Sequence, residues 1–591
     1  MTLARRPIKI VEIDLPQCTR TYGSLPCTAV LGTTGARKCF NSRATCQSVT
    51  AFSPADMTLR FGENVSGARP ANNVFPALTS VSARPGRVNL SGIDPKSTPL
   101  GQRARVTVVL QDFTWQDSIL DPYRAQRVTG AAQADGIGYD PATRGTFFTR
   151  LHARWPYYLG RSLRVLTGYE GDALGSMRVA HYVITEWSGP NAAGVVTITA
   201  QDVLNLADPD KAQAPRPSQG KLAADITDTA TAFTLTPATI GDEYDAAGLI
   251  AVGRELMRFT RVGDDFTVTE RGVAETDVKG HSAGDVVQQA LEYVNQPADA
   301  IIADLLVTFA GVSSAFIDSA AWQAEAERWL GGIVFSAIIA KPEGVATLIG
   351  ELCQHGIMVY WDEIDQELKF YVNKPLEISQ TYVPLTDGAQ IVEGSADIED
   401  SVEERASQIL FWHGVIDPTD TVTDGKNFKR LHVAADLIGE GPDLYGESRV
   451  KEIFSRWFGT SGDDANAGIL ADRLLNRYRN TPRTLTCDID RKDLASINLT
   501  TLVEVSSHLV LDDTGAALPY PMQVRYREET AGERIRIEAQ TFTFDGRFGF
   551  IMLDTAPDYD AASPTEIAEG CFIVDDTLLQ FPDGTGPYVL F

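Results

Sequence analysis

Four of the chain's seven cysteines, Cys18, Cys27, Cys39 and Cys46, lie close together near its N-terminus. Their spacing is C-x8-C-x11-C-x6-C, with Gly, Thr and Arg frequent between them. Thiolates that gather in space bind a metal ion or an iron–sulfur cluster, whereas thiols in an oxidising compartment pair as disulfides. The odd total of cysteines, and a start without the apolar run of a signal peptide, favour a reducing cytoplasm. A metal or a cluster is therefore the first chemistry to consider.

The spacing bears on which metal these thiolates would hold. Structural zinc usually takes its cysteines in close pairs such as C-x2-C, and this segment has no such pair. An iron–sulfur cluster is larger than one ion and accepts ligands from separate loop positions. Glycines 23, 32 and 35 allow the backbone to approach the sulfur atoms closely. We expect a cluster, while a zinc site of unusual spacing and metal-free buried cysteines remain open alternatives.

Charge is unevenly distributed along the chain. The net charge is −26, which argues against a protein whose whole surface grips nucleic acid, because phosphate binding needs a basic footprint. Residues 1–70 nevertheless carry nine Lys and Arg against four Asp and Glu, a balance of +5 that leaves −31 for the remainder. The cysteine segment is a basic island, and its Arg20, Arg37, Lys38 and Arg43 would offset the negative charge of a thiolate-bound cluster.

Length and patterning predict several domains with mainly β structure and some α+β parts. The 591 residues exceed the size of one domain, and short apolar runs of period two alternate with Gly and Pro clusters. The longest apolar run, 331–340, is too short to cross a bilayer, so we expect no membrane segment. The predicted parts are a cysteine-rich segment (1–54), a first β domain (55–210), an inserted small β-barrel (216–295), an α+β domain (296–378), a β-rich domain (379–545) and a docking tail (546–591).

Helical periodicity appears in four stretches of the chain. Pro at a first turn, apolar residues at steps of four and Gly at the end predict helices over 297–311, 319–332 and 342–356, with Ser319 as the cap of the second. A fourth helix is predicted over 466–480. Cys353 and Cys487 fall on the apolar sides of a helix and a strand, which favours a structural role for both.

One string matches a catalytic pattern. GHSAG, residues 280–284, fits G-x-S-x-G with Ser282 in the nucleophile position. A nucleophile elbow needs a strand before the serine and a helix after it, whereas strand-like patterning lies on both sides here. We expect a hairpin turn in which His281 is structural. The phosphate-binding loop, the H-E-x-x-H zinc motif and the dinucleotide fingerprint are missing from the sequence, and we expect no enzymatic activity.

The segment from Asp121 to Tyr169 is rich in Arg and aromatic residues. In isolation it resembles a nucleic-acid surface. Because the whole chain is acidic, and because Arg and Tyr are also enriched at protein contacts, we expect it to serve in an interface or in core packing.

These segments together resemble a known family. TYG followed by PCTA, then TTGARKCFNSRATCQ, LGQRARVTVVLQDF, DPYRAQR and YDPATRGTFFTRLHARWPYYLGRSLRVLTGY, are similar to the baseplate hub, or tail-tip, proteins of long-tailed (siphovirus-type) bacteriophages and gene transfer agents. GVATLIGELCQHGIMVYWD and LADRLLNRYRNTPRTLTCDID fit the same picture. The resemblance covers most of residues 10–545. The cysteine and Arg-aromatic segments are its specific part, and the inserted barrel and the tail match weakly.

The resemblance implies a virion protein made in the host bacterial cytoplasm and placed at the tail tip. It implies a homotrimer around the tail axis that joins the tail tube, distal tail protein and tape measure protein to the central fibre or receptor-binding proteins. DNA would pass through the channel without specific binding, helped by the acidic charge. It also implies a [4Fe-4S] cluster on Cys18, Cys27, Cys39 and Cys46. The alternatives are a tail-delivered cell-wall or carbohydrate hydrolase, a redox protein and a zinc-stapled adaptor.

Overall fold

The structure is a computed structural model that describes residues 6–63, 74–90, 98–374, 381–459, 464–494, 496–511, 513–530 and 534–541, with two short strands beyond them. The chain forms two compact units. The first contains residues up to 85, residues 103–205 and residues 363–366, and the second contains the remainder. The predicted docking tail and Cys571 lie outside the described residues, apart from those two strands.

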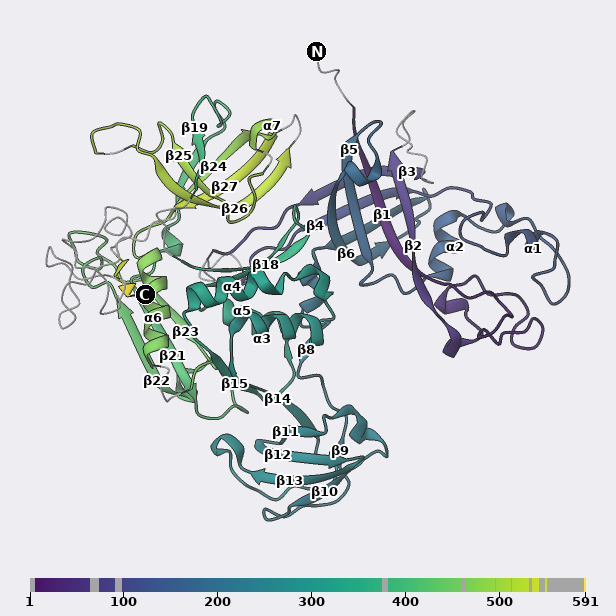
Figure 1. Cartoon of the computed structure of the whole chain (residues 1–591), viewed down its shortest axis with the longest axis horizontal. Helices are drawn as coiled ribbons and strands as arrows, with labels where there is room; N and C mark the ends of the chain where they lie inside the picture. The colour runs from purple at the N-terminus through teal and green to yellow at the C-terminus, as the bar shows by residue number, and fades with distance from the viewer. Residues whose placement is uncertain are drawn as a thin grey trace. The chain divides into compact units, whose positions relative to one another are not determined.

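The first unit is built on a closed seven-stranded barrel (Figure 1). Its order is β1-β2-β3-β4-β7-β6-β5, and the barrel closes because β1 pairs with both β2 and β5. Most neighbours are antiparallel, and β2 and β3 run parallel. The strands are β1 (Pro7–Cys18), β2 (Pro54–Glu63), β3 (Val74–Arg84), β4 (Arg105–Gln111), β5 (Ser162–Tyr169), β6 (Arg178–Ser188) and β7 (Val195–Gln201).

Two long connections leave this barrel. The first, between β1 and β2, carries all four N-terminal cysteines and two short 3-10 turns, Arg43–Thr45 and Val49–Ala51. The second, between β4 and β5, is the Arg-aromatic segment and holds α1 (Arg124–Val128) and α2 (Phe147–Arg154). Helix α2 begins at Thr146, whose hydroxyl forms a capping box with Thr149. The cysteine segment is therefore an excursion from the barrel, and its first strand is part of the barrel wall.

An aromatic cluster fills the barrel where α2 meets it. Phe147 and Phe148 are fully buried, and their rings contact Phe61 of β2 at centroid distances of 6.0 and 5.4 Å. Phe113 stacks on Phe147 at 4.8 Å. Buried aromatic side chains of this size dominate core energetics. The Arg-aromatic segment is thus anchored to the barrel by its own core residues.

The second unit begins with a small β domain. Its sheet has the order β15-β14-β11-β12-β13-β10-β9, and a bridge from Lys221 of β9 to Val286 brings its first strand beside the start of β14. Five of its seven strands lie in the range 216–295, for which a small inserted β-barrel is predicted; β14 ends one residue after that range, and β15 lies beyond it. We call this part the inserted β domain. The strands are β9 (Lys221–Leu222), β10 (Ala232–Thr236), β11 (Ala247–Val252), β12 (Glu255–Val262), β13 (Asp265–Arg271), β14 (Val287–Gln296) and β15 (Phe335–Ile339). A separate two-stranded pair is formed by β8 (Gln213–Ala214) and β16 (Glu343–Gly344).

The predicted helices are all present in this unit. They are α3 (Ala298–Asp304), which continues as a π-turn over Leu305–Phe309, α4 (Ser319–Leu330), α5 (Val345–Cys353) and α6 (Asp464–Tyr478). The expected cap Ser319 is wrong by one residue, because the carboxylate of Asp318 accepts the hydrogen bond from the Ala321 amide. Helix α5 leads through Gly356 into the hairpin of β17 (Ile357–Asp362) and β18 (Glu367–Val372).

Two further sheets complete the described part of this unit. A six-stranded sheet has the order β19-β25-β26-β27-β24-β20, and a three-stranded sheet, β22-β21-β23, is covered by α6. The strands are β19 (Val383–Thr386), β20 (Asp397–Asp400), β21 (Gln408–Val415), β22 (Phe428–Ala435), β23 (Val450–Phe454), β24 (Arg483–Asp490), β25 (Leu502–Ser506), β26 (Tyr520–Thr530) and β27 (Arg534–Thr541), besides the short α7 (Arg491–Leu494), β28 (Phe548–Gly549) and β29 (Val589–Leu590).

The expected fold class is confirmed, since the molecule is mainly β with α+β parts and several sheets. The domain boundaries drawn from the sequence stay a prediction. Cys353 and Cys487 are fully buried, as their patterns predict. Among the described residues, no helix is long and apolar enough to cross a membrane.

Candidate metal centre

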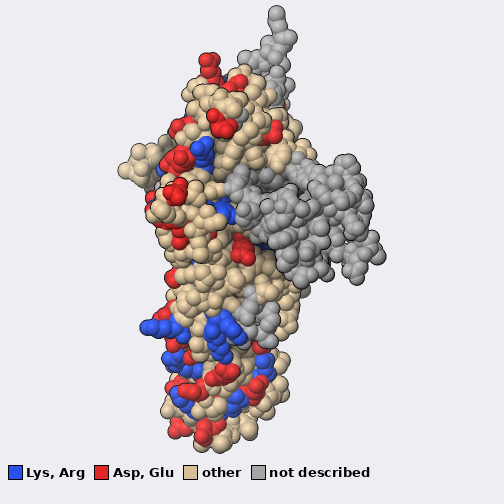
Figure 2. Space-filling model, turned by 90° about the vertical axis from the view of Figure 1, so that its left-hand side faces the viewer, with Lys and Arg blue, Asp and Glu red and all other residues tan. Residues whose placement is uncertain are grey.

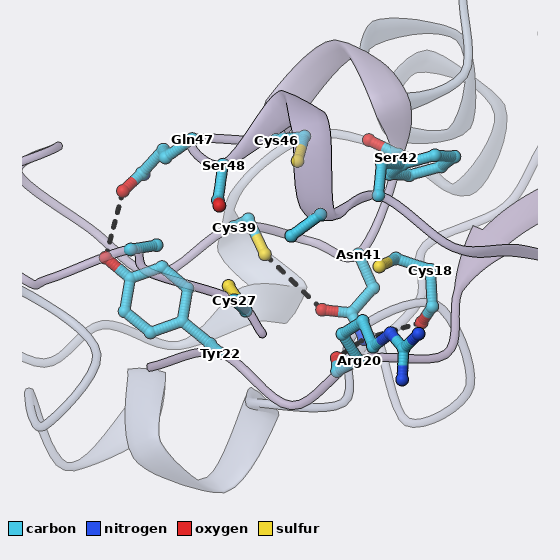
Figure 3. A pocket seen from close by; sticks show the side chains of 13 residues that line it. Cys18, Arg20, Tyr22, Cys27, Cys39, Asn41, Ser42, Cys46, Gln47 and Ser48 are labelled. Atoms are coloured by element: carbon cyan, nitrogen blue, oxygen red, sulfur yellow. Dashed lines mark hydrogen bonds between the residues drawn. The ribbon is translucent and has the colours of Figure 1, made fainter. Parts of the chain in front are cut away.

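The four N-terminal cysteines line one cavity in the first unit. Cys18 ends β1, Cys46 follows the turn Arg43–Thr45, and Cys27 and Cys39 lie in the loops between them. In Figure 3 the four sulfur atoms point toward the same space. All four side chains are free thiols of intermediate exposure. The loop therefore brings together residues that are spread over 29 positions of the sequence.

The cavity between the cysteines is small. It holds about 330 Å³ not filled by protein atoms, part of it open to solvent. Within the part of the chain that the structure describes, no three His, Cys, Asp or Glu side chains are close enough to hold one metal ion. A single zinc ion would require the sulfur atoms about 2.3 Å from one point, whereas a [4Fe-4S] cluster would take one thiolate on each of its irons.

Asn41 ties the two ends of the cysteine segment together. Its amide nitrogen donates to the carbonyl oxygens of Cys18 and Arg20, at 3.0 and 3.3 Å. The amide of Cys18 donates in return to the carbonyl of Asn41, at 2.7 Å. The thiol of Cys39 lies 3.4 Å from the side-chain oxygen of Asn41. Asn41 has a φ of 56°, a left-handed conformation that Asn adopts more readily than most residues.

The surroundings of Cys39 favour its neutral thiol. Burial raises the pKa of Cys39, a hydrogen bond from the Asn41 backbone opposes this, and the proximity of Cys46, Cys27 and Cys18 raises it further. These mutual effects mean that the four sulfur atoms interact electrostatically. Four thiolates in one cavity repel each other, and a bound cationic centre would relieve that repulsion.

Two tyrosines and a lysine close one side of the site. The hydroxyl of Tyr123 accepts a hydrogen bond from the Tyr22 amide at 2.6 Å, and the two rings meet edge to face. The ammonium of Lys38 lies 5.4 Å from the centre of the Tyr123 ring and 5.9 Å from that of Tyr22. Gln47 accepts from the Tyr22 hydroxyl at 2.9 Å and donates to the Arg37 carbonyl at 2.6 Å. Lys38, one of the four cations expected to offset the charge of a cluster, is thus held against the rings of these two tyrosines.

A buried arginine from α1 fixes the backbone at Cys39. Arg127 is fully buried, and its Nη2 donates to the carbonyl oxygens of Lys38 and Cys39, both at 2.8 Å. Its Nε donates to the carboxylate of Asp121 at 2.6 Å, in an ion pair from which water is excluded on both sides. Sequence reasoning missed Arg127 as part of this site. The only signal for it was the density of Arg in the second connection.

Phe40 is contacted by two guanidinium groups. Those of Arg127 and Arg154 lie 3.7 and 3.9 Å from the centre of its ring. Arg154 is held in turn by a two-pronged hydrogen bond to Asp117. Cations over an aromatic face are attracted by its quadrupole, more strongly when desolvated. The expectation that the Arg-aromatic segment serves in packing is met at Arg127 and Arg154, which join it to the cysteine segment.

The GHSAG string lies outside this site, in the inserted β domain. Ser282 and its neighbours form a turn before β14, without the helix that a nucleophile elbow requires. The Nε2 of His281 lies 2.8 Å from a carboxylate oxygen of Glu255, which is 1% exposed and also binds Arg271 through both oxygens. The arrangement gives His281 a structural partner.

Fold and site define a mainly β protein whose N-terminal barrel carries a four-cysteine pocket. No family model and no curated protein matches the sequence. Among solved structures, the 43 kDa tail protein of prophage MuSo2 from Shewanella oneidensis has 12% identity and a TM-score of 0.34, covering 78% of this chain and 95% of that one. The prophage tail protein gp18 from Listeria monocytogenes has 9% identity and a TM-score of 0.28, covering 64% and 84%. A PdpA–VgrG complex has 8% identity and a TM-score of 0.32, covering 94% and 67%.

Proposed function

We propose that this chain is a structural protein of a phage-like tail, acting as a baseplate hub at the tail tip. The proposal rests on one observation: the cysteine segment and the Arg-aromatic segment, which are the parts most similar to hub proteins, contact each other. The cysteine segment and the Arg-aromatic segment are separated by about seventy residues of sequence, yet Arg127 and Arg154 bind them into one body. Arg and aromatic residues that join two segments in this way are typical of proteins built for assembly.

The four cysteines would hold a [4Fe-4S] cluster in this proposal. Cys18, Cys27, Cys39 and Cys46 supply four thiolates, so that no iron is left open for a substrate. The cluster would supply a fixed crosslink between distant points of the loop. Asn41 and Arg127 position the backbone of two of these ligands, Cys18 and Cys39. The proposed role of the cluster is therefore structural.

The proposed assembly is a homotrimer that surrounds the DNA channel and contacts the tube, distal tail, tape measure and fibre proteins. The net charge of −26 would disfavour adhesion of the passing DNA if acidic side chains line the channel. On the face in Figure 2, acidic and basic side chains are interspersed in the lower part of the view, and acidic ones predominate above it.

The cluster is tested by the iron, zinc and acid-labile sulfide content of protein purified without oxygen. The expected result is iron and sulfide in matched amounts, lost when the four N-terminal cysteines are changed to Ser. Cys353→Ala is the matched control, because this buried cysteine lies on α5 and should leave the iron content unchanged. Zinc in place of iron, or equal metal in the quadruple variant, would contradict the cluster.

The assembly is tested separately by native mass spectrometry of the same sample. The hub proposal expects a species of three times the 64.2 kDa chain. A monomer at all concentrations, together with absence of the protein from purified particles, would overturn it. The metal content tests the cluster and the mass tests the trimer, so either proposal can be contradicted while the other stands.

A further inference from the structure

A second cavity lies next to the cysteine segment, in the same unit. It holds about 740 Å³ not filled by protein atoms, part of it open to solvent, and runs between the end of β1, the turn Arg43–Thr45 and the chain after α2. Its walls are apolar and include Pro16, Phe52, Pro54 and Trp155. The indole nitrogen of Trp155 donates to the Pro16 carbonyl at 2.9 Å, which fixes the ring as part of the wall. We call this cavity the arginine groove, for the residues at its rims.

Two arginines at the rims of the groove lack a carboxylate partner. Arg43 is exposed; its Nη1 donates to the Val49 carbonyl, and its guanidinium lies 5.5 Å from the centre of the Phe52 ring. Arg161 donates from Nε to the Tyr157 carbonyl at 3.3 Å. Neither forms an ion pair with any described residue, whereas Arg154 in the same wall is neutralised by Asp117. The groove therefore presents two available positive charges.

Exposed apolar side chains adjoin these charges. Tyr157, which lines the groove, is 61% exposed, and its neighbour Leu159 is 63% exposed. Aromatic and Arg side chains around a concave apolar surface are the residues that contribute most to protein interfaces. The complementary ligand is a chain segment with an aromatic or proline side chain between two carboxylates.

The chain itself contains such a segment. Residues 546–591, which lie almost wholly outside the described residues, carry eight Asp and Glu against one Arg. Within them, Asp554–Asp560 reads DTAPDYD, so Tyr559 stands between Asp558 and Asp560 and follows Pro557. The basic island at one end of the chain and this acidic segment at the other favour contact between copies.

We propose that the arginine groove is a docking site for the acidic segment Asp554–Asp560 of a neighbouring copy of this chain. Tyr559 fills the apolar groove, and Asp558 and Asp560 pair with Arg43 and Arg161. Such charge-assisted pairs give orientation as well as affinity. The inference requires two copies and is independent of the cluster and of the tail role.

Phe52 links the groove to the candidate metal centre. Its side chain lines both the arginine groove and the cysteine cavity, so the two cavities share this residue. Arg43 stacks on that ring and lies three residues before Cys46. A segment bound in the groove would therefore contact the loop that carries the cysteines.

The test uses the full chain with a photo-crosslinking benzoylphenylalanine at Tyr559, mixed from isotopically heavy and light preparations. The expected result is heavy–light crosslinks from residue 559 to residues 43–54 or 154–161. The double variant Arg43→Glu and Arg161→Glu should lower their yield at least about tenfold, because opposed charges across an interface become like charges. Adding Asp558→Lys and Asp560→Lys to that variant should restore the yield.

Arg105→Glu is the matched control, since Arg105 is an exposed arginine of β4 that does not line the groove. It should leave the crosslinks unchanged. Crosslinks that persist in the double variant, that form only within one chain, or that lead to other surfaces would overturn the proposal. Restoration by the charge swap would show that the double variant is folded.

Discussion

The guanidinium of Arg127 donates a 2.8 Å hydrogen bond to the carbonyl of Cys39, across 88 positions of the sequence. The same side chain is paired with Asp121 and stacks on Phe40. One buried residue of α1 thus fixes both the backbone and the neighbouring ring of a proposed cluster ligand. Hydrogen bonds and an ion pair therefore hold the cysteine segment in place, so a cluster would need to contribute less to its folding.

This relationship predicts the effect of Arg127→Ala. The change leaves the buried carboxylate of Asp121 without its partner, and breaking a buried ion pair costs about 3–5 kcal/mol. We expect a loss of that order in the free energy of unfolding of the first unit, and a lower iron content because Cys39 is no longer held. Chemical denaturation and iron analysis measure the two effects.

Arg124→Ala provides the control for this change. Arg124 lies on the same helix, is only half-buried and donates to the Gln116 backbone rather than to a carboxylate. A cost below about 1 kcal/mol is expected for a hydrogen bond of this kind. Equal losses in the two variants would show that α1 as a whole, and not Arg127, supports the cysteine segment.

The aromatic cluster of the barrel gives a second prediction. Phe147→Ala removes a fully buried ring that contacts Phe61, Phe75 and Phe113. Such truncations leave a cavity and cost about 3–5 kcal/mol. Thermal unfolding of the first unit should shift accordingly, while Leu159→Ala, at a position 63% exposed, should shift little. Similar shifts for both would mean that α2 does not close the barrel core.

The sequence predicted the local elements of this molecule better than its long-range contacts. The helices over 297–311, 319–332, 342–356 and 466–480 are present because period and capping are local properties. The four cysteines could be singled out because their types and spacing are visible in one segment. The contacts of Arg127 and Arg154 with Phe40 could not be predicted, because no periodicity links α1 and α2 to a residue that lies 87 and 114 positions before these arginines.

The cap of α4 shows the same limit at short range. Asp318 and Ser319 are both good capping residues, and the sequence alone does not decide between them. The chain before the helix turns so that the Asp318 carboxylate reaches the Ala321 amide at 3.1 Å. The backbone conformation before α4, which depends on the surrounding packing, therefore makes Asp318 the cap.

A third prediction concerns the GHSAG turn. Burial opposes the ionisation of Glu255, but hydrogen bonds from Arg271 and His281 outweigh it and hold the pKa of Glu255 below its usual value. Glu255→Ala would leave Arg271 without its carboxylate and should destabilise the inserted domain by about 3–5 kcal/mol. Ser282→Ala, in the same turn, should leave stability unchanged. Hydrogen exchange of the domain measures both variants, and peptidoglycan release that depends on Ser282 would contradict the structural interpretation of the turn.

The last prediction is a pH dependence that centres on His355. The ring is buried against Phe335, Phe411 and Phe458. Its Nδ1 donates to the Leu352 carbonyl at 3.1 Å, so the Nε2 of the neutral ring accepts from the Ser455 hydroxyl at 2.8 Å. Burial lowers the pKa of His355 to about 4, against a small opposing effect of that carbonyl. The imidazole is therefore neutral in the folded protein throughout the range in which an unfolded histidine takes up a proton.

The direction of the pH dependence of stability follows from the lower pKa of His355 in the folded protein than in the unfolded chain. Above pH 6.5 the neutral His355 ring makes its full contribution to the free energy of unfolding. This contribution is lost as the pH falls from about 6.5 to about 4, because in that range His355 is protonated in the unfolded chain but not in the folded one. The loss amounts to roughly 3 kcal/mol over that interval. Hydrogen exchange of β17 and β21 at a series of pH values should reveal it. His355→Gln, which cannot titrate, should flatten this part of the curve even if it lowers the plateau; an unchanged slope in that variant would assign the dependence to other groups.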